Sequence, residues 1–188
     1  IRHQAGSNNA LAYTHQTLNP ALLAELTGID VIANFRSRDL AAGGHGAPLV
    51  PAFHAQQFAS DKNTAVLNLG GIANLTLLPQ KGDVTGFDCG PGNMLMDAWI
   101  AKHQGQAFDQ GGAWAAQGVV NDFLLERMLA DPFFAKVPPK STGRDDFHLQ
   151  WLEKQLGSNT YKAEDVQATL LRLTVTPALQ SIHTYAPQ

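Results

Sequence analysis

One carboxylate, Asp88, occupies a position in the sequence where catalytic chemistry is expected. The apolar run Val84–Asp88 predicts a β-strand that ends at this residue. Gly90, Pro91 and Gly92 follow and predict a tight turn, because glycine permits a positive φ and proline fixes its own. The sequence therefore places Asp88 at a strand end, directly before a turn.

A helix is expected to begin immediately after this turn. Asn93 is a candidate N-cap for a helix over Met94–Lys102. The first amides of such a helix attract anions, so the turn can hold a phosphate or an oxyanion. A carboxylate beside that position can act as a general base or can hold a metal ion. The alternative is that Asp88 only caps a turn, as aspartate often does.

A second motif lies upstream, in Thr64–Pro79. Two β-rich runs flank Gly70-Gly71, which predicts a hairpin with a glycine corner. Asn68 and Asn74 bracket that corner. At a Gly-Gly corner the backbone can approach a ligand closely, and polar side-chain amides beside it can bind phosphate oxygens. Many hairpins that bind no ligand also carry Gly-Gly.

Two arginines form a third candidate site. Asn19-Pro20 begins a predicted helix that stops at Gly28, and Asp30–Phe35 then predicts a buried strand. Arg36 and Arg38 would follow the end of that strand, where ligands of open α/β sheets gather. They can bind a carboxylate or a phosphate, or they can form an exposed ion pair with a nearby aspartate.

The second half of the chain predicts helices and one polar loop. Gly118–Leu129, Phe147–Leu156 and Val166–His183, the last capped by Asp165, have helical patterns. Val137–Asp145 carries two cations and two hydroxyls and predicts a solvated connector, with contact to an anionic ligand as the alternative. Val84–Asp88 would follow the hairpin as the third strand of a β-meander, and this meander together with the helices predicts an α/β protein.

Composition narrows the function classes. The chain has 188 residues, 44% apolar, with a formal charge of −3, so no basic patch favours nucleic acid. The single cysteine, Cys89, cannot form an internal disulfide and is typical of a reducing compartment. No base accompanies it in sequence, so we do not expect it to be a nucleophile. No apolar run is long enough to span a bilayer.

The chain resembles anhydro-N-acetylmuramic acid kinases over nearly its whole length, in family order. Six stretches carry the resemblance: Phe35–Asp39, Gly44–His54, Asn68–Thr76, Gly86–Trp99, Pro138–Arg144 and Asp165–Thr169. Position 89 is cysteine where the family most often has threonine, which we interpret as a tolerated variant of similar size.

The resemblance implies an actin-like (RNase H-like) ATPase fold of two α/β lobes that close over ATP and Mg²⁺. The implied enzyme opens the anhydro bridge of 1,6-anhydro-N-acetylmuramic acid with water and phosphorylates O6 during cell-wall recycling. Asp88 would be the base that activates water. Arg36 and Arg38 would be candidates for the lactyl carboxylate of the sugar. Nucleotide phosphates would lie near Asn68, Gly70, Gly71, Asn74, Gly90, Gly92 and Asn93.

The resemblance also implies a cytoplasmic homodimer. The family's first phosphate loop, a Gly-Thr-Ser-Met-Asp-Gly-like stretch, is absent, so we expect an internal piece of a longer protein that is inactive alone. Residues 1–45 would belong to the first lobe and 46–188 to the second. Two alternatives stay open: another sugar or acyl-phosphate kinase of the same fold, and an inactive sugar-binding relative.

Overall fold

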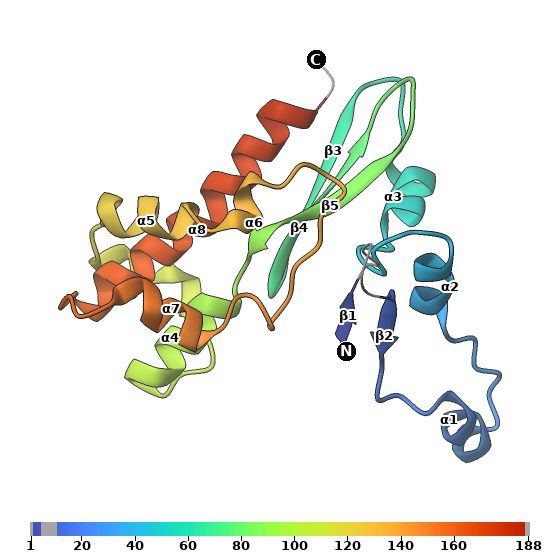
Figure 1. Cartoon of the computed structure of the whole chain (residues 1–188), viewed down its shortest axis with the longest axis horizontal. Helices are drawn as coiled ribbons and strands as arrows, with labels where there is room; N and C mark the ends of the chain where they lie inside the picture. Colours follow the sequence, from blue (N-terminus) through green and yellow to red (C-terminus); the bar gives the residue numbers. More distant parts are fainter. Residues whose placement is uncertain (1, 5–10, 187–188) are drawn as a thin grey trace. The chain divides into compact units, whose positions relative to one another are not determined.

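The computed structural model describes residues 2–4 and 11–186. The chain divides into two compact units, Ile1–Leu49 and Val50–Gln188, and each is described by itself. Their helices and strands are labelled in Figure 1. Among the helices that the structure describes, none combines the length and the hydropathy needed to cross a bilayer.

The first unit is small. Its elements are β1 (Arg2–Gln4), β2 (Tyr13–His15), α1 (Pro20–Thr27) and α2 (Phe35–Ala41). The two strands pair antiparallel. The predicted helix start is confirmed, because the Asn19 side chain accepts a hydrogen bond from the Leu22 amide at 3.0 Å. The predicted stop is confirmed too, since Gly28 adopts a left-handed conformation at the end of α1.

The strand predicted over Asp30–Phe35 is wrong. These residues form an irregular segment, and Phe35 begins α2 instead. Asn34 has φ 65°, which interrupts an extended run, and Ile32 is 80% exposed. A short apolar run predicts a buried strand only where neighbouring strands cover it, and here it has no such neighbour among the described residues. Arg36 and Arg38 consequently lie in a helix rather than after a strand.

The second unit contains one sheet and most of the helices. Its strands are β3 (Thr64–Leu69), β4 (Ile72–Leu78) and β5 (Thr85–Pro91), in the order β3-β4-β5 and antiparallel throughout. The predicted hairpin and meander are therefore confirmed. The helices are α3 (Pro51–Phe58), α4 (Met94–Gln104), α5 (Asp122–Leu129), α6 (Pro132–Ala135), α7 (Leu149–Leu156) and α8 (Ala163–Tyr185), with short 3₁₀ turns η1 (Gln110–Gly112) and η2 (Ala115–Gln117).

Different helices cover the two faces of this sheet. The long helix α8 runs along the strands (Figure 1), and its Ala178 packs with Leu75, Phe87 and Cys89 in one apolar cluster. On the opposite face, the Nδ1 atom of His54 in α3 lies 3.0 Å from the hydroxyl of Thr76. Alternation of side chains along each strand separates these two sets.

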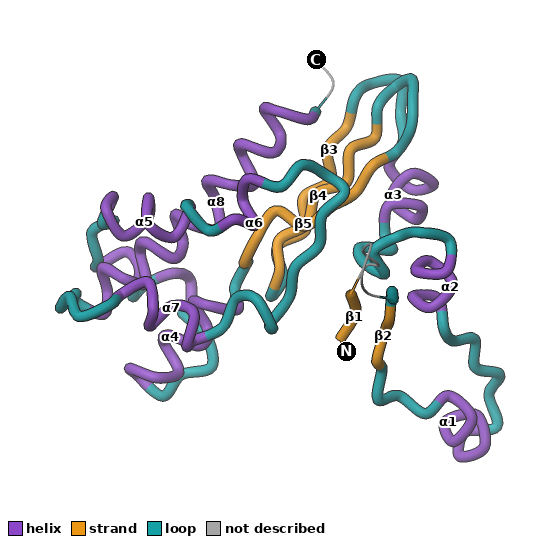
Figure 2. The backbone as a smooth tube through the Cα atoms, viewed as in Figure 1, coloured by secondary structure: helices purple, strands orange, loops and turns teal. Residues whose placement is uncertain are grey.

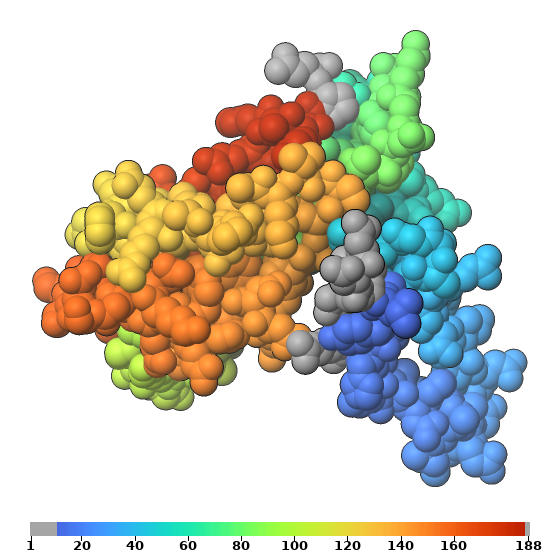
Figure 3. Space-filling view, in the orientation of Figure 1, coloured from blue at the N-terminus to red at the C-terminus, as the bar shows by residue number. Residues whose placement is uncertain are grey.

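A second apolar cluster joins the helices of this unit. Buried side chains of α4, α5, α7 and the first half of α8 meet there, with the helices gathered beyond one end of the strands (Figure 2). In the space-filling view, the atoms from α5 to α7, yellow to orange, form one continuous surface (Figure 3). The indole of Trp99 donates a hydrogen bond to the Ala163 carbonyl at 2.8 Å, which ties α4 to the start of α8.

Strand β5 continues farther than predicted. It runs through Gly90 to Pro91, so Asp88 lies inside the strand and not at its end. The register with β4 shifts between Ala73 and Asn74, which pair with Gly90 and Asp88 respectively. A bulge therefore leaves Cys89 as the extra residue, and pairing continues beyond it at Gly90 and Pro91, although the Gly-Pro-Gly sequence favours a turn.

The corner of the β3–β4 hairpin makes a close backbone contact with the residues that follow β5. The amides of Gly92 and Asn93 donate to the carbonyls of Gly71 and Gly70 at 2.9 and 2.7 Å. A Cβ atom on residue 92 would lie 2.1 Å from the Gly70 carbonyl oxygen. Glycine at position 92 is required by this approach of two backbones.

We expect Gly92→Ala to lower the free energy of unfolding by about 1–3 kcal/mol, the usual range for overpacking. The added methyl group must push Gly70 away and lengthen both amide–carbonyl contacts. Urea unfolding measures the change. Gly143→Ala is the control, because a Cβ there meets nothing within 4 Å. Equal midpoints for the two variants would contradict the close contact.

Candidate functional site

Three predicted site residues form a row across the sheet. Asn68 pairs with Asn74 on the neighbouring strand, and Asn74 pairs with Asp88 on the next. Directly opposed residues share a face, with Cβ atoms about 4.5–5.5 Å apart. The row lies on the face opposite α8, because the alternate residues Leu75 and Phe87 belong to the cluster with that helix. One carboxylate and two amides thus lie side by side.

The predicted glycines gather at the same end of the sheet. Gly70 and Gly71 form the hairpin corner directly after β3, and Gly90 pairs with Ala73 close to it. Gly92 and Asn93 bond to the corner, as described above. Every predicted site residue of the second unit is therefore brought to one end of the β3–β4–β5 sheet.

The start of α4 differs from the prediction. Asn93 occupies the N-cap position, but its side chain makes no capping hydrogen bond and its backbone is already helical. The amide of Met94 points to the Gly71 carbonyl at 3.4 Å, so the first amides serve the hairpin corner. The first bond inside the helix runs from Asp97 to Asn93 at 2.8 Å, which leaves the Leu95 and Met96 amides as the next donors at this helix end.

Asp88 is held by a segment far along the chain. It is 5% exposed, and its amide donates to the Lys140 carbonyl at 3.0 Å. The Thr142 amide donates to Asp88 Oδ2 at 2.9 Å. The loop that carries Lys140 and Thr142 joins α6 to α7 and runs along β5 (Figure 2). Two contacts, one to the backbone and one to the carboxylate, fix the position of Asp88.

The prediction of a solvated connector over Val137–Asp145 is wrong for its centre. Lys140 is 6% exposed, and its ammonium lies 4.8 Å from the centroid of the Phe133 ring. The polar composition of the loop favoured solvent exposure. Composition does not show that backbone groups of the loop hydrogen-bond to Asp88 at the edge of β5. Sequence reasoning therefore missed Lys140 and Thr142 as residues of this site, although both lie in the motif Pro138–Arg144.

Burial changes the ionisation of two groups beside Asp88. It lowers the pKa of Lys140, more than the neighbouring Cys89 raises it. It also raises the pKa of the Cys89 thiol, which outweighs the lowering by a hydrogen bond from Ser181 and by the charge of Lys140. A thiol whose pKa is raised is a poor nucleophile, in agreement with the sequence-based expectation for Cys89.

The two arginines belong to the first unit. Arg36 is half-buried in α2, and its guanidinium donates to the carbonyl of Gly46. The Gly46 amide donates to Asp39 Oδ2 at 2.7 Å. Arg36 thus bonds the carbonyl of Gly46 and Asp39 bonds its amide. Arg38 is exposed. Arg36 therefore has a structural contact that the sequence did not predict.

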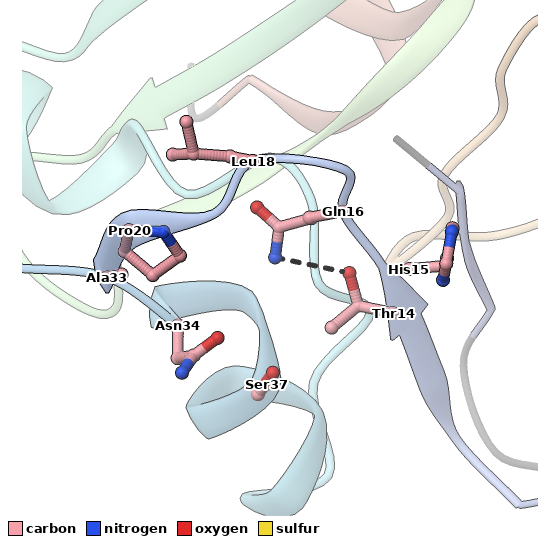
Figure 4. Close-up of a pocket in the computed structure, with 8 residues that line it drawn as sticks. All are labelled: Thr14, His15, Gln16, Leu18, Pro20, Ala33, Asn34 and Ser37. Carbon is pink, nitrogen blue, oxygen red and sulfur yellow. Dashed lines mark hydrogen bonds between the residues drawn. The ribbon is translucent and has the colours of Figure 1, made fainter. Parts of the chain in front are cut away.

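The first unit also has an open pocket whose lining includes neither arginine. Figure 4 shows Gln16 and Thr14, joined by a 3.5 Å hydrogen bond, on one side and Asn34 and Ser37 on the other. None of the predicted site residues lines this pocket. The lining residues are Thr14, His15, Gln16, Leu18, Pro20, Ala33, Asn34 and Ser37. Within the described ranges 2–4 and 11–186, no three or more His, Cys, Asp or Glu side chains gather into a metal-binding cluster.

Comparison with known proteins places this sequence in a family. A sequence model of the family described as anhydro-N-acetylmuramic acid kinase matches residues 1–188. The chain belongs to the anhydro-N-acetylmuramic acid kinase family. The family predicted from the sequence motifs is therefore confirmed.

Individual relatives agree with this assignment. The chain is 55% identical to the anhydro-N-acetylmuramic acid kinase of Cupriavidus metallidurans and 54% identical to that of Ralstonia nicotianae. It is 56% identical to the protein of that name from Pseudomonas paraeruginosa. Each match covers 100% of this chain and 51% of the relative. The chain thus spans about half the length of the curated relatives that it matches.

We expect Lys140→Met to leave stability at neutral pH unchanged or raised, because a buried charge is replaced by an apolar side chain of similar length. The folded protein binds the Lys140 proton less tightly than the unfolded chain, since its pKa is lowered from 10.5. Stability of the unsubstituted chain must therefore rise with pH between the lowered pKa and 10.5.

The substitution should remove this rise, and urea unfolding at several pH values measures it. Lys81→Met, in the exposed turn before β5, is the matched control and should retain the pH dependence. Parallel pH profiles for Lys140→Met and the unsubstituted chain would show that Lys140 is not desolvated.

Proposed function

We propose that the longer protein containing this chain is an ATP-dependent kinase of 1,6-anhydro-N-acetylmuramic acid. It opens the anhydro bridge with water and phosphorylates O6, giving N-acetylmuramic acid 6-phosphate for reuse of cell-wall material. Membership of the family supports the reaction. The observation that carries it is the buried carboxylate of Asp88, in a row with two asparagine amides beside a glycine corner.

Asp88 is the general base in this proposal. Water that attacks an anomeric carbon must lose a proton as the C–O bond forms, and a carboxylate is suited to accept it. The C1–O6 bond breaks as the new C1–O bond forms, so O6 keeps the electron pair, stays on C6 and becomes the nucleophile for phosphoryl transfer. Thr142 and Lys140 support the role, because they hold the carboxylate and its backbone in one position.

The hairpin corner fits a nucleotide phosphate. Gly70 and Gly71 have no side chains, and the amides of Asn68 and Asn74 can donate to phosphate oxygens. Leu95 and Met96 offer backbone amides at the start of α4. Bound ATP would supply the phosphoryl group, with Mg²⁺ to neutralise its charge. Mg²⁺ needs only one or two protein carboxylates when phosphates and water complete its shell, so the absence of an acidic cluster from the described residues fits.

Family membership and the antiparallel meander followed by a helix also support an actin-like, two-lobe fold. In the whole protein, residues 1–45 would belong to the first lobe and residues 46–188 to the second. A cytoplasmic homodimer is part of the same proposal.

Replacement of the base tests the reaction. We expect Asp88→Asn, in the full-length protein with ATP, Mg²⁺ and the anhydrosugar, to lower kcat by about 10²–10⁴-fold, the usual worth of one positioned base. Asp83→Asn, in an exposed turn, is the matched control. Formation of the sugar 6-phosphate is measured.

Each other outcome has a definite meaning. Normal turnover by Asp88→Asn would remove the role of Asp88. Phosphorylation of other sugars in place of the anhydrosugar would indicate a different kinase of this fold. Sugar binding without turnover by the unsubstituted protein would indicate an inactive relative.

The arginines give a second test. We propose that Arg36 and Arg38 meet the lactyl carboxylate of the sugar. Arg38→Ala should raise KM for the sugar with little effect on stability, because its side chain is exposed. Arg36→Ala should also lower the melting temperature, because it removes the donor to Gly46. If KM is unchanged in both variants, the carboxylate is bound elsewhere.

A further inference from the structure

Thr142 connects Asp88 to a second carboxylate. Its amide donates to Asp88 Oδ2 at 2.9 Å, and its hydroxyl donates to Asp146 Oδ2 at 2.7 Å. Both acceptors are carboxylates, and such charge-assisted hydrogen bonds are stronger than neutral ones. Thr142 is thereby fixed to Asp88 through its backbone amide and to Asp146 through its side-chain hydroxyl.

The position of Asp146 is determined by the helical core. The carbonyl of Gly143 accepts hydrogen bonds from the amides of Asp146 and Phe147, at 3.2 and 3.1 Å, which closes a turn. Phe147 is completely buried and packs edge-on against Trp151, with ring centroids 4.9 Å apart. The turn therefore cannot shift without moving a core aromatic ring, and Asp146, although exposed, holds Thr142 from a rigid base.

The other end of the segment is fixed independently. The Lys140 carbonyl accepts from the Asp88 amide at 3.0 Å, and the Lys140 side chain is buried against Phe133. These contacts fix where the segment lies along β5, but they do not themselves restrain rotation of the peptide plane before Thr142. The hydrogen bond from the Thr142 hydroxyl to Asp146 restrains that rotation, and with it the direction of the amide that meets Asp88.

We propose that Thr142 and Asp146 are positioning residues, which orient the Asp88 carboxylate for proton abstraction. The inference rests on the proposed function of Asp88 as the base. Neither residue needs to touch the substrate. Their effect is geometric, because a displacement of about 1 Å in a catalytic group can cost up to about 100-fold in rate.

The test compares three variants of the full-length protein. Thr142→Val keeps the shape but loses the hydroxyl, Thr142→Ser keeps the hydroxyl, and Asp146→Ala removes its acceptor. We expect kcat to fall between about 10- and 100-fold in Thr142→Val and Asp146→Ala, with KM changed less than about twofold. Thr142→Ser should retain most of kcat. Thr160→Val, at an exposed threonine, is the matched control.

A spectroscopic measurement follows the contact without relying on activity. The amide proton of Thr142 should move in the NMR spectrum when Asp88 is replaced by Asn, because its acceptor loses charge. In Asp146→Ala the same resonance should shift, because the amide turns away from the carboxylate. An unmoved Thr142 amide in both variants would overturn the proposed connection.

The kinetic outcomes separate this inference from the proposed function. If Asp88→Asn abolishes turnover but Thr142→Val and Asp146→Ala do not lower kcat, positioning by this pair is wrong and the role of Asp88 stands. Equal losses in Thr142→Val and Thr142→Ser also overturn it, because the serine retains the hydroxyl. If Asp88→Asn turns over normally, the proposed base is wrong, and the amide shifts alone decide whether the contact exists.

Discussion

The close approach of two backbones at the hairpin corner determines the arrangement of the second unit. Gly92 and Asn93 donate their amides to Gly71 and Gly70, and only a residue without a side chain fits at position 92. This contact sets where β5 ends and where α4 begins. Thr174 of α8 adds a hydrogen bond to the Gly92 carbonyl at 2.9 Å, so the long helix is fixed to the same point. Sheet, turn and helical core therefore meet at the candidate site.

Asp88 is held from both edges of its strand. On one side, β4 pairs with β5 and places Asn74 and Asn68 in line with the carboxylate. On the other side, the loop between α6 and α7 supplies the Lys140 carbonyl and the Thr142 amide. A carboxylate that is 5% exposed would be costly without such donors. The same contacts that make its burial tolerable also restrict its motion, as a positioned base requires.

The buried lysine shows how this loop reconciles polar composition with burial. Lys140 places its ammonium over the Phe133 ring and 3.4 Å from the Phe134 carbonyl, so part of its lost hydration is replaced. Its pKa is nevertheless lowered, which means that desolvation is not fully offset. A loop whose polar composition predicts solvent exposure is therefore partly buried and contacts Asp88.

Local sequence patterns were sufficient to predict some of the elements and the family. Residues close together in sequence were enough to predict the cap and stop of α1, the Gly-Gly hairpin and the meander. The motifs around Asp88 are specific enough to identify the kinase family. The tertiary structure decided what depends on distant partners. Asp30–Phe35 is not a strand because no strand pairs with it among the described residues, and β5 passes Asp88 because β4 pairs with it as far as Pro91. Thr142 reaches Asp88 across 54 positions of sequence, a contact that no local pattern encodes, because loop backbone groups find their partners only after the core has set the path of the chain.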